Sequence, residues 1–173
     1  MRAWIRLRRW VRHWLTPPLL LRRTFPPAAL HRLRAVIGDA EAGHSGEIRF
    51  AVEAALPWSY LRRNLHARDR ALMVFSKLRV WDTEHNNGVL LYVELADRAV
   101  EIVADRGIAQ RVPKAEWQAV CHHVRERFRA GRFEDGVADA VRQIGARLAA
   151  NFPLQAGEAR GNELPDDPVV LGQ

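Results

Sequence analysis

The stretch VLLYVEL, residues 89–95, constrains the fold of this chain more than any other part of the sequence. Apolar side chains stand at nearly every position in it. A strand with one face in water alternates apolar and polar residues, whereas a strand covered on both faces is apolar almost throughout. We therefore expect residues 89–95 to form a central strand with other elements packed against both of its faces.

The segment AVEIVA, residues 99–104, follows after a short polar connection and is expected to return antiparallel to this strand. With a turn at Asp97 and Arg98, paired residue numbers add up to about 195, which sets Leu90 opposite Asp105. Asp97 is then a turn residue whose short side chain bonds to nearby backbone.

The tripeptide Ala-Asp-Arg stands at both ends of this second strand, at 96–98 and again at 104–106. Eight residues at roughly 3.3 Å each place Asp97 and Asp105 about 26 Å apart. The two carboxylates therefore cannot serve one ion or one substrate group.

Residues 47–53, EIRFAVE, alternate apolar and polar side chains, which predicts a half-buried strand with Arg49 and Glu53 on its outer face. Other segments repeat apolar residues at the spacing of a helix. They are 25–46, 67–81, 114–130 and 133–150.

The composition fits one globular domain, with 173 residues of which 48% are hydrophobic. Cys121 is the one cysteine, which excludes an intramolecular disulfide and fits a reducing compartment. Its spacing to Arg127 matches that of thiol phosphatases, but a helical stretch without glycine lacks their phosphate loop, so we interpret it as a core cysteine. No export signal and no apolar run of about 18 to 20 residues occurs, so we expect a cytoplasmic protein.

The positive charge is concentrated at the N-terminus. The net charge is +7, yet residues 1–34 hold nine arginines and no acid. Residues 1–15 place their apolar and charged side chains on opposite faces of a helix that Pro17 and Pro18 end. We divide the chain into this basic amphipathic helix with a hinge (1–22), a domain (23–153) and an extended tail (154–173).

The N-terminal helix has three interpretations. Trp4, Trp10 and Trp14, together with the arginines of residues 1–23, suit an anionic membrane surface, where apolar insertion and charge attraction add. The tryptophans could equally pack on the domain. Nucleic acid is the weakest of the three, because no recognised binding module accompanies the arginines.

The expected hairpin gathers oxygen ligands at one end of the sheet. The polar loop WDTEHNNG brings Asp82, Glu84 and Asn87 beside Asp105. Carboxylate and amide oxygens on flexible loops suit Ca²⁺, and Mg²⁺ is the alternative ion. The structural alternative is that Asn87 turns the chain, Asp105 caps a turn and the loop acids are solvated. No phosphate-binding or dinucleotide-binding loop occurs, so we expect no nucleotide cofactor.

The middle of the chain resembles the TPM domain family, which includes bacterial proteins and a thylakoid lumen protein of photosystem II repair. The resemblance covers about residues 24–153 and rests on HSGEIRFAVE, on NNGVLLYVELADRAVEIVADRG, on GRFEDG and on NFP. It implies a three-layer α/β/α sandwich with a small, mostly mixed central sheet. It also implies a cleft at the loop end that binds Ca²⁺ in some members, and an acid phosphatase activity proposed for the plant member.

We therefore expect a binding or accessory module for a protein partner. A divalent cation would bind at Asp82, Glu84, Asn87 and Asp105, and the module would associate peripherally with the inner face of the membrane. The alternative is a metal-dependent phosphoester hydrolase in which the cation polarises a phosphoryl oxygen. A third interpretation is nucleic-acid binding through the basic N-terminus.

Overall fold

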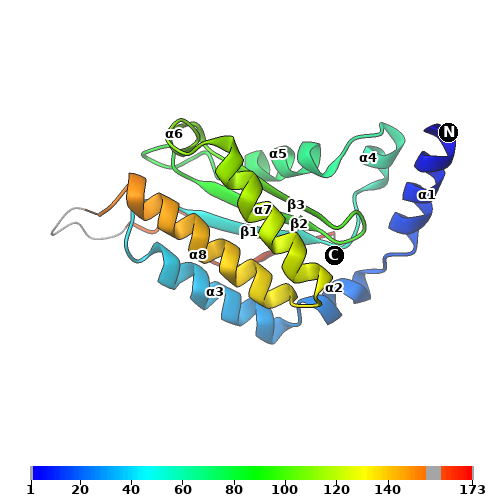
Figure 1. Cartoon of the computed structure of the whole chain (residues 1–173), viewed down its shortest axis with the longest axis horizontal. Helices are drawn as coiled ribbons and strands as arrows, with labels where there is room; N and C mark the ends of the chain where they lie inside the picture. The colour runs from blue at the N-terminus through cyan, green and yellow to red at the C-terminus, as the bar shows by residue number, and fades with distance from the viewer. Residues whose placement is uncertain (1, 155–160, 173) are drawn as a thin grey trace.

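The computed structural model of this chain describes residues 2–154 and 161–172 (Figure 1). In these ranges the elements are α1 (Arg2–Trp14), α2 (Pro18–Thr24), α3 (Pro27–Glu41), β1 (Ile48–Glu53), α4 (Trp58–Arg62), α5 (Ala67–Lys77), β2 (Val89–Glu94), β3 (Ala99–Ala104), α6 (Arg106–Ala109), α7 (Lys114–Arg129), α8 (Phe133–Asn151) and β4 (Val169–Leu171). The helices and strands expected from periodicity are all present. None of the described helices has the length and apolar character needed to cross a membrane.

The four strands form one mixed sheet in the order β3-β2-β1-β4. β2 is central, parallel to β1 on one side and antiparallel to β3 on the other. β1 also pairs in parallel with β4. Every residue of β2 is buried, as its continuous apolar sequence predicts.

Helices cover both faces of the sheet, which gives three layers (Figure 1). Successive residues of β2 point to opposite faces. Val89, Leu91 and Val93 pack with α3, α7 and α8, whereas Leu90 and Tyr92 pack with α5. The expected α/β/α sandwich with a small mixed sheet is confirmed.

The outer face predicted for β1 is buried instead of exposed. Glu53 on this face accepts two hydrogen bonds from the guanidinium of Arg70 at 2.8 and 2.9 Å, and the hydroxyl of Tyr92 also donates to it. The prediction of a half-buried strand was wrong because α5 supplies a cation that satisfies this carboxylate inside the protein.

The C-terminal segment 161–172 helps to cover the same face. Leu164 packs into the apolar cluster between α5 and the sheet, and the backbone N–H of Glu163 donates to Glu47 at 3.0 Å. β4 then adds the edge strand beside β1. Residues 161–172 of the expected extended tail are therefore packed on the domain, and a strand of three residues is too short to show an alternating pattern in the sequence.

The hairpin register differs from the expected one by two residues. Glu94 pairs with Ala99, so the turn is longer than a two-residue turn, and Gly88 rather than Leu90 lies opposite Asp105. Arg98 adopts the left-handed conformation in this turn, with φ of 54°. A shift by two keeps each side chain on its expected face, so Asp105 still lies beside the loop that precedes β2.

The hinge expected between the N-terminal helix and the domain is mostly helical. α2 begins at Pro18, in the first helical position, where the missing N–H of proline leaves no hydrogen bond unmade. Leu21 of α2 is buried against the domain. Residues 18–24 are therefore part of the packed structure.

Gly88 is required by a close approach of two backbone segments at the start of β2. A Cβ atom at this position would lie 1.9 Å from the carbonyl oxygen of Val80. No side chain fits at such a distance, so the loop before β2 can close only over glycine.

We expect Gly88→Ala to lower the free energy of unfolding by about 3 kcal/mol, because the backbone of residue 80 has to move. Urea denaturation measures this loss. The matched control is Gly43→Ala, where a Cβ meets nothing within 4 Å and the change should stay within about 0.5 kcal/mol. Equal stability of the two variants would contradict the close approach.

Candidate functional site

The predicted cation ligands lie at the end of the sheet where β2 begins and β3 ends. Asn87 and Asp105 are buried, whereas Asp82 and Glu84 are exposed. The backbone N–H of Glu84 donates to the carboxylate of Glu163 at 3.0 Å, so the C-terminal segment contacts this loop. In the described ranges, the carboxylates of this end form no group of three within 4.8 Å.

The antiparallel pairing places the backbone of Asp105 beside Gly88, the residue that follows Asn87. The backbone N–H of Asp105 donates to the carbonyl of Gly88 at 2.9 Å. Asp105 also caps α6, with Oδ1 accepting the N–H of Arg106 at 2.7 Å. The side-chain amide of Asn87 donates to Ser45 Oγ at 3.3 Å.

Each of these two side chains keeps one buried oxygen that has no hydrogen-bond partner in the described part of the chain. They are Oδ2 of Asp105 and Oδ1 of Asn87. A buried oxygen that accepts no hydrogen bond costs free energy unless water or an ion binds to it. The loop end therefore has two acceptors suited to a hard cation, one of them a carboxylate.

At the opposite end of the sheet from α6 lies α1 (Figure 1). Its charged face contacts the domain through Arg9 and His13. Trp10 packs against Trp58 of α4 in a tilted arrangement, with ring centroids 4.7 Å apart and ring planes inclined by 59°. Arg9 Nη2 donates to the carbonyl of Leu65 at 2.8 Å, and the backbone N–H of Leu56 donates to Nδ1 of His13 at 3.1 Å.

Asp97, in the turn between β2 and β3, holds this face of α1. Its carboxylate accepts a hydrogen bond from Arg9 Nε at 2.8 Å and one from Arg12, and Nε2 of His13 lies 3.1 Å from Oδ2. Burial by itself raises the pKa of Asp97, but His13 and Arg9 outweigh burial and hold that pKa well below its usual range.

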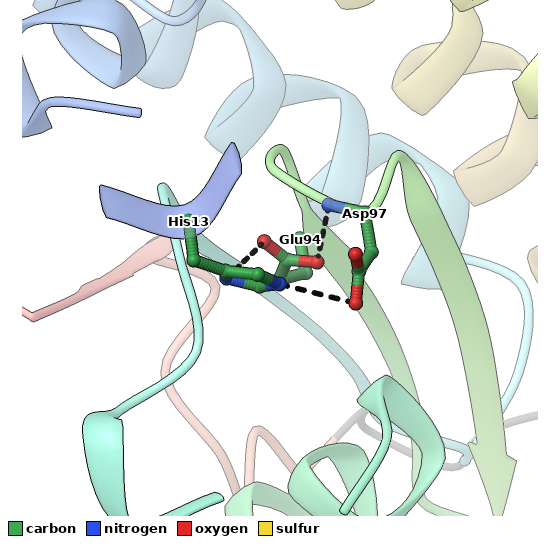
Figure 2. A group of neighbouring side chains, drawn as sticks. All are labelled: His13, Glu94 and Asp97. Atoms are coloured by element: carbon green, nitrogen blue, oxygen red, sulfur yellow. Dashed lines mark hydrogen bonds and ion pairs between the residues drawn. The ribbon is translucent and has the colours of Figure 1, made fainter. Parts of the chain in front are cut away.

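Glu94, the last residue of β2, completes the arrangement (Figure 2). Its carboxylate accepts the backbone N–H groups of Ala96 and Asp97 at 2.7 and 2.9 Å, and one oxygen lies 3.8 Å from His13 Nδ1. Burial raises the pKa of Glu94 to about 8, because removal from water outweighs the two amide donors. We call Arg9, Arg12, His13, Glu94 and Asp97 the α1 docking cluster.

His13, Glu94 and Asp97 also have the spacing of a metal site, with one ligand atom of each within 4.8 Å of the others. A cation bound there would share the carboxylate of Asp97 with the guanidinium groups of Arg9 and Arg12, which would repel it. It would also leave Nδ1 of His13 tied to a backbone amide. We therefore interpret the group as the polar contact that fastens α1.

The role of Asp97 corrects the expectation of a simple turn residue, because its side chain binds α1 instead of nearby backbone. The separation of Asp97 from Asp105 by the length of β3 is confirmed. The sequence contains no signal that pairs Asp97 with Arg9 or Arg12, since the partners are 88 and 85 positions apart in the chain. The expectation of a core cysteine is confirmed, since Cys121 is buried and burial raises its pKa to about 11.

The apolar face of α1 points away from the domain. The residues that share this exposed face are Trp4, Leu7, Val11, Trp14 and Leu15. Trp14 is 83% exposed, which is unusual for so large an apolar side chain. Of the three tryptophans of α1, only Trp10 packs on the domain.

Comparison with known proteins identifies one family and a solved relative. The family model described as TPM domain matches residues 22–147. The NMR structure of the BA42 protein from the psychrophilic bacterium Bizionia argentinensis is 30% identical, covers 83% of this chain and 92% of its own, and superposes with a TM-score of 0.71. No curated protein matches the chain.

We expect Glu94→Gln to flatten the pH dependence of stability between about pH 5 and pH 8. The folded-state pKa of Glu94, about 8, lies above its unfolded value, so the folded chain holds one more proton across this interval. The free energy of unfolding therefore falls as pH rises, by up to about 1.4 kcal/mol per pH unit. An amide cannot release this proton, so the variant lacks the slope.

Urea denaturation at a series of pH values across this interval measures the effect. Glu116→Gln is the matched control, because Glu116 is an exposed glutamate of α7 and its variant should keep the wild-type slope. A Glu94→Gln variant with the slope of the wild type would show that Glu94 is ionised throughout.

Proposed function

We propose that this chain, which belongs to the TPM domain family, is a binding module held at an anionic membrane surface by α1. The observation that carries the proposal is the orientation of α1. Its charged face is docked on the domain through Asp97, while Trp4, Trp14 and their apolar neighbours point outward. An amphipathic helix that exposes its apolar face requires a partner for that face.

The charges around this face favour a lipid surface. Arg8 is exposed and lies over the ring of Trp4 at 4.9 Å from its centroid. Arg6 of α1 is also exposed, as are Arg22 and Arg23 of α2. Arginines beside tryptophans suit the headgroup layer, where the ring inserts and the guanidinium stays with phosphate. The free Cys121 agrees with attachment at the inner, cytoplasmic face.

Nucleic-acid binding is less well supported than membrane binding. Arg9 and Arg12 are paired with Asp97, Arg32 pairs with Glu134, and Arg34 pairs with Asp167. These pairs consume part of the positive charge of the N-terminal region. A row of exposed apolar side chains also gives no affinity for a phosphate backbone.

We expect the full chain to sediment with vesicles of phosphatidylglycerol and phosphatidylcholine at low salt, and to bind more weakly as salt is raised. Trp14→Ala should reduce the affinity about tenfold, because one large apolar side chain no longer inserts. Trp81→Ala is the matched control, since Trp81 is an exposed tryptophan that follows α5, away from α1. A wild-type protein that stays in the supernatant at low salt would overturn the proposal.

A second activity, cation binding at the loop end, has its own supporting observation. Oδ2 of Asp105 and Oδ1 of Asn87 are buried without a hydrogen-bond partner in the described ranges. Asp82 and Glu84 lie in the exposed loop next to them and would complete the oxygen ligands of Ca²⁺ or Mg²⁺. In this proposal the domain binds the cation at the end opposite to α1.

We expect Ca²⁺ to raise the midpoint of thermal unfolding and Asp105→Asn to remove the rise. At a concentration ten times the Kd, binding to the native state contributes about 1.4 kcal/mol, which is roughly 3 to 6 °C for a chain of this size. Asparagine remains a good cap for α6, so the variant should fold. The measurement compares chelator, Ca²⁺ and Mg²⁺.

Asp135→Asn is the control for this test, because Asp135 is an exposed acid at the start of α8, outside the loop end, and should leave the calcium response unchanged. No rise at millimolar ion would leave Asp105 with its capping role alone. The phosphoester hydrolase alternative depends on the same cation, and would be supported by metal-dependent phosphate release that Asp105→Asn abolishes.

A further inference from the structure

A groove of about 570 Å³ opens where α2, the β2–β3 turn and the α7–α8 connection meet. Its apolar wall consists of Leu20, Leu95, Phe128 and Phe133. Phe128 and Phe133 pack on each other, with ring centroids 4.9 Å apart, and both remain partly exposed. The size lies within the range of sites that bind small ligands.

Three arginines line the same groove, Arg98 from the turn, and Arg125 and Arg129 from α7. Arg98 is exposed and forms no ion pair within the described residues. Arg129 pairs with the exposed Glu126, and Arg125 donates to the carbonyl of Val100 at 3.4 Å. We call this cavity the Arg-rimmed groove.

The acidic residues that reach the groove do not cancel this charge. Asp97 is held by Arg9 and Arg12 of α1. Glu94 is fully buried and its two oxygens accept backbone N–H groups. The groove therefore combines an apolar wall with a positive rim, which is the complement of an anionic amphiphile.

Arg98 occupies a position that glycine would fill with less strain, because its φ of 54° lies in the left-handed region. A non-glycine residue kept in such a conformation is a reason to look for a function of its side chain. Here the turn directs a guanidinium to the edge of the groove.

The groove has one exposed apolar residue in common with the segment that follows α1. Leu20, which is 42% exposed, belongs to the apolar wall, and it follows the exposed residues Leu15 and Leu19 in the chain. The entrance of the groove is therefore close in sequence to the helix that we propose for the membrane.

We propose that the Arg-rimmed groove binds one molecule of an anionic phospholipid, with an acyl chain against Phe128 and Phe133 and the phosphate among Arg98, Arg125 and Arg129. This inference rests on the proposed membrane attachment, because the lipid would be drawn from that surface. Guanidinium groups bind phosphate oxygens through paired, charge-assisted hydrogen bonds.

The test uses dihexanoylphosphatidylglycerol below its critical micelle concentration, so that no membrane surface is present, and isothermal titration calorimetry with the full chain. We expect binding of one lipid per chain. Arg98→Gly and Arg129→Gln should each weaken it about tenfold, since each removes a charged donor. Arg98→Gly also relieves the left-handed turn, so a loss of binding in it cannot come from a loss of folding.

Arg142→Gln is the matched control for Arg129→Gln. Both arginines are exposed on helices and pair with a carboxylate three residues earlier, but Arg142 is not part of the groove. Equal binding of dihexanoylphosphatidylcholine, or binding of glycerol phosphate as tight as that of the lipid, would overturn the inference. The first result would show that the groove does not distinguish an anionic from a zwitterionic headgroup. The second would show that the apolar wall contributes nothing to binding.

Trp14→Ala separates this inference from the proposed function, because Trp14 does not line the groove. This variant should bind vesicles about tenfold more weakly and keep its affinity for the short lipid. Wild-type chain that binds vesicles but not the short lipid would overturn the groove and leave membrane attachment standing. Wild-type chain that binds the short lipid but not vesicles would overturn the membrane attachment, whereas lipid binding in the groove would stand.

Discussion

The burial of β2 on both faces is the constraint on which the rest of the structure depends. A strand whose side chains are all removed from water needs a helical layer on each face and a paired strand on each edge. α3, α7 and α8 supply one layer, and α5 with the C-terminal segment supplies the other. The ends of the strand are then the places where loops and turns come together, and both candidate sites lie there.

The two ends of the sheet have different chemistry. At the loop end, Asn87 and Asp105 flank the close backbone packing at Gly88, and each has a buried oxygen without a hydrogen-bond partner among the described residues. At the other end, Asp97 accepts the guanidinium groups of α1, and Glu94 accepts two backbone N–H groups of the β2–β3 turn. Oxygen ligands without donors suit a cation, whereas carboxylates already bound by guanidinium groups do not.

The polarity of α1 is reversed relative to an ordinary surface helix. Helices on globular domains bury an apolar stripe and leave charges in water. Here the α1 docking cluster places Arg9 and His13 against the domain and leaves Trp4 and Trp14 outside. These charged contacts determine which face of α1 lies against the domain, and they leave the apolar face exposed. Membrane attachment and cation binding are separate proposals, since each depends on different residues, whereas lipid capture builds on membrane attachment.

The sequence by itself determined the central strand, the helices and the hairpin, because periodic burial leaves a local pattern in the chain. It also placed Asp105 beside the loop before β2. A register shift of two residues changes neither the face of the sheet on which a side chain lies nor the end of the sheet at which Asp105 stands. Only the tertiary structure decided that β1 is buried on both faces, that residues 169–171 join the sheet, and that Asp97 fastens α1. These outcomes depend on contacts between segments far apart in the chain, and such contacts leave no periodic trace in either partner.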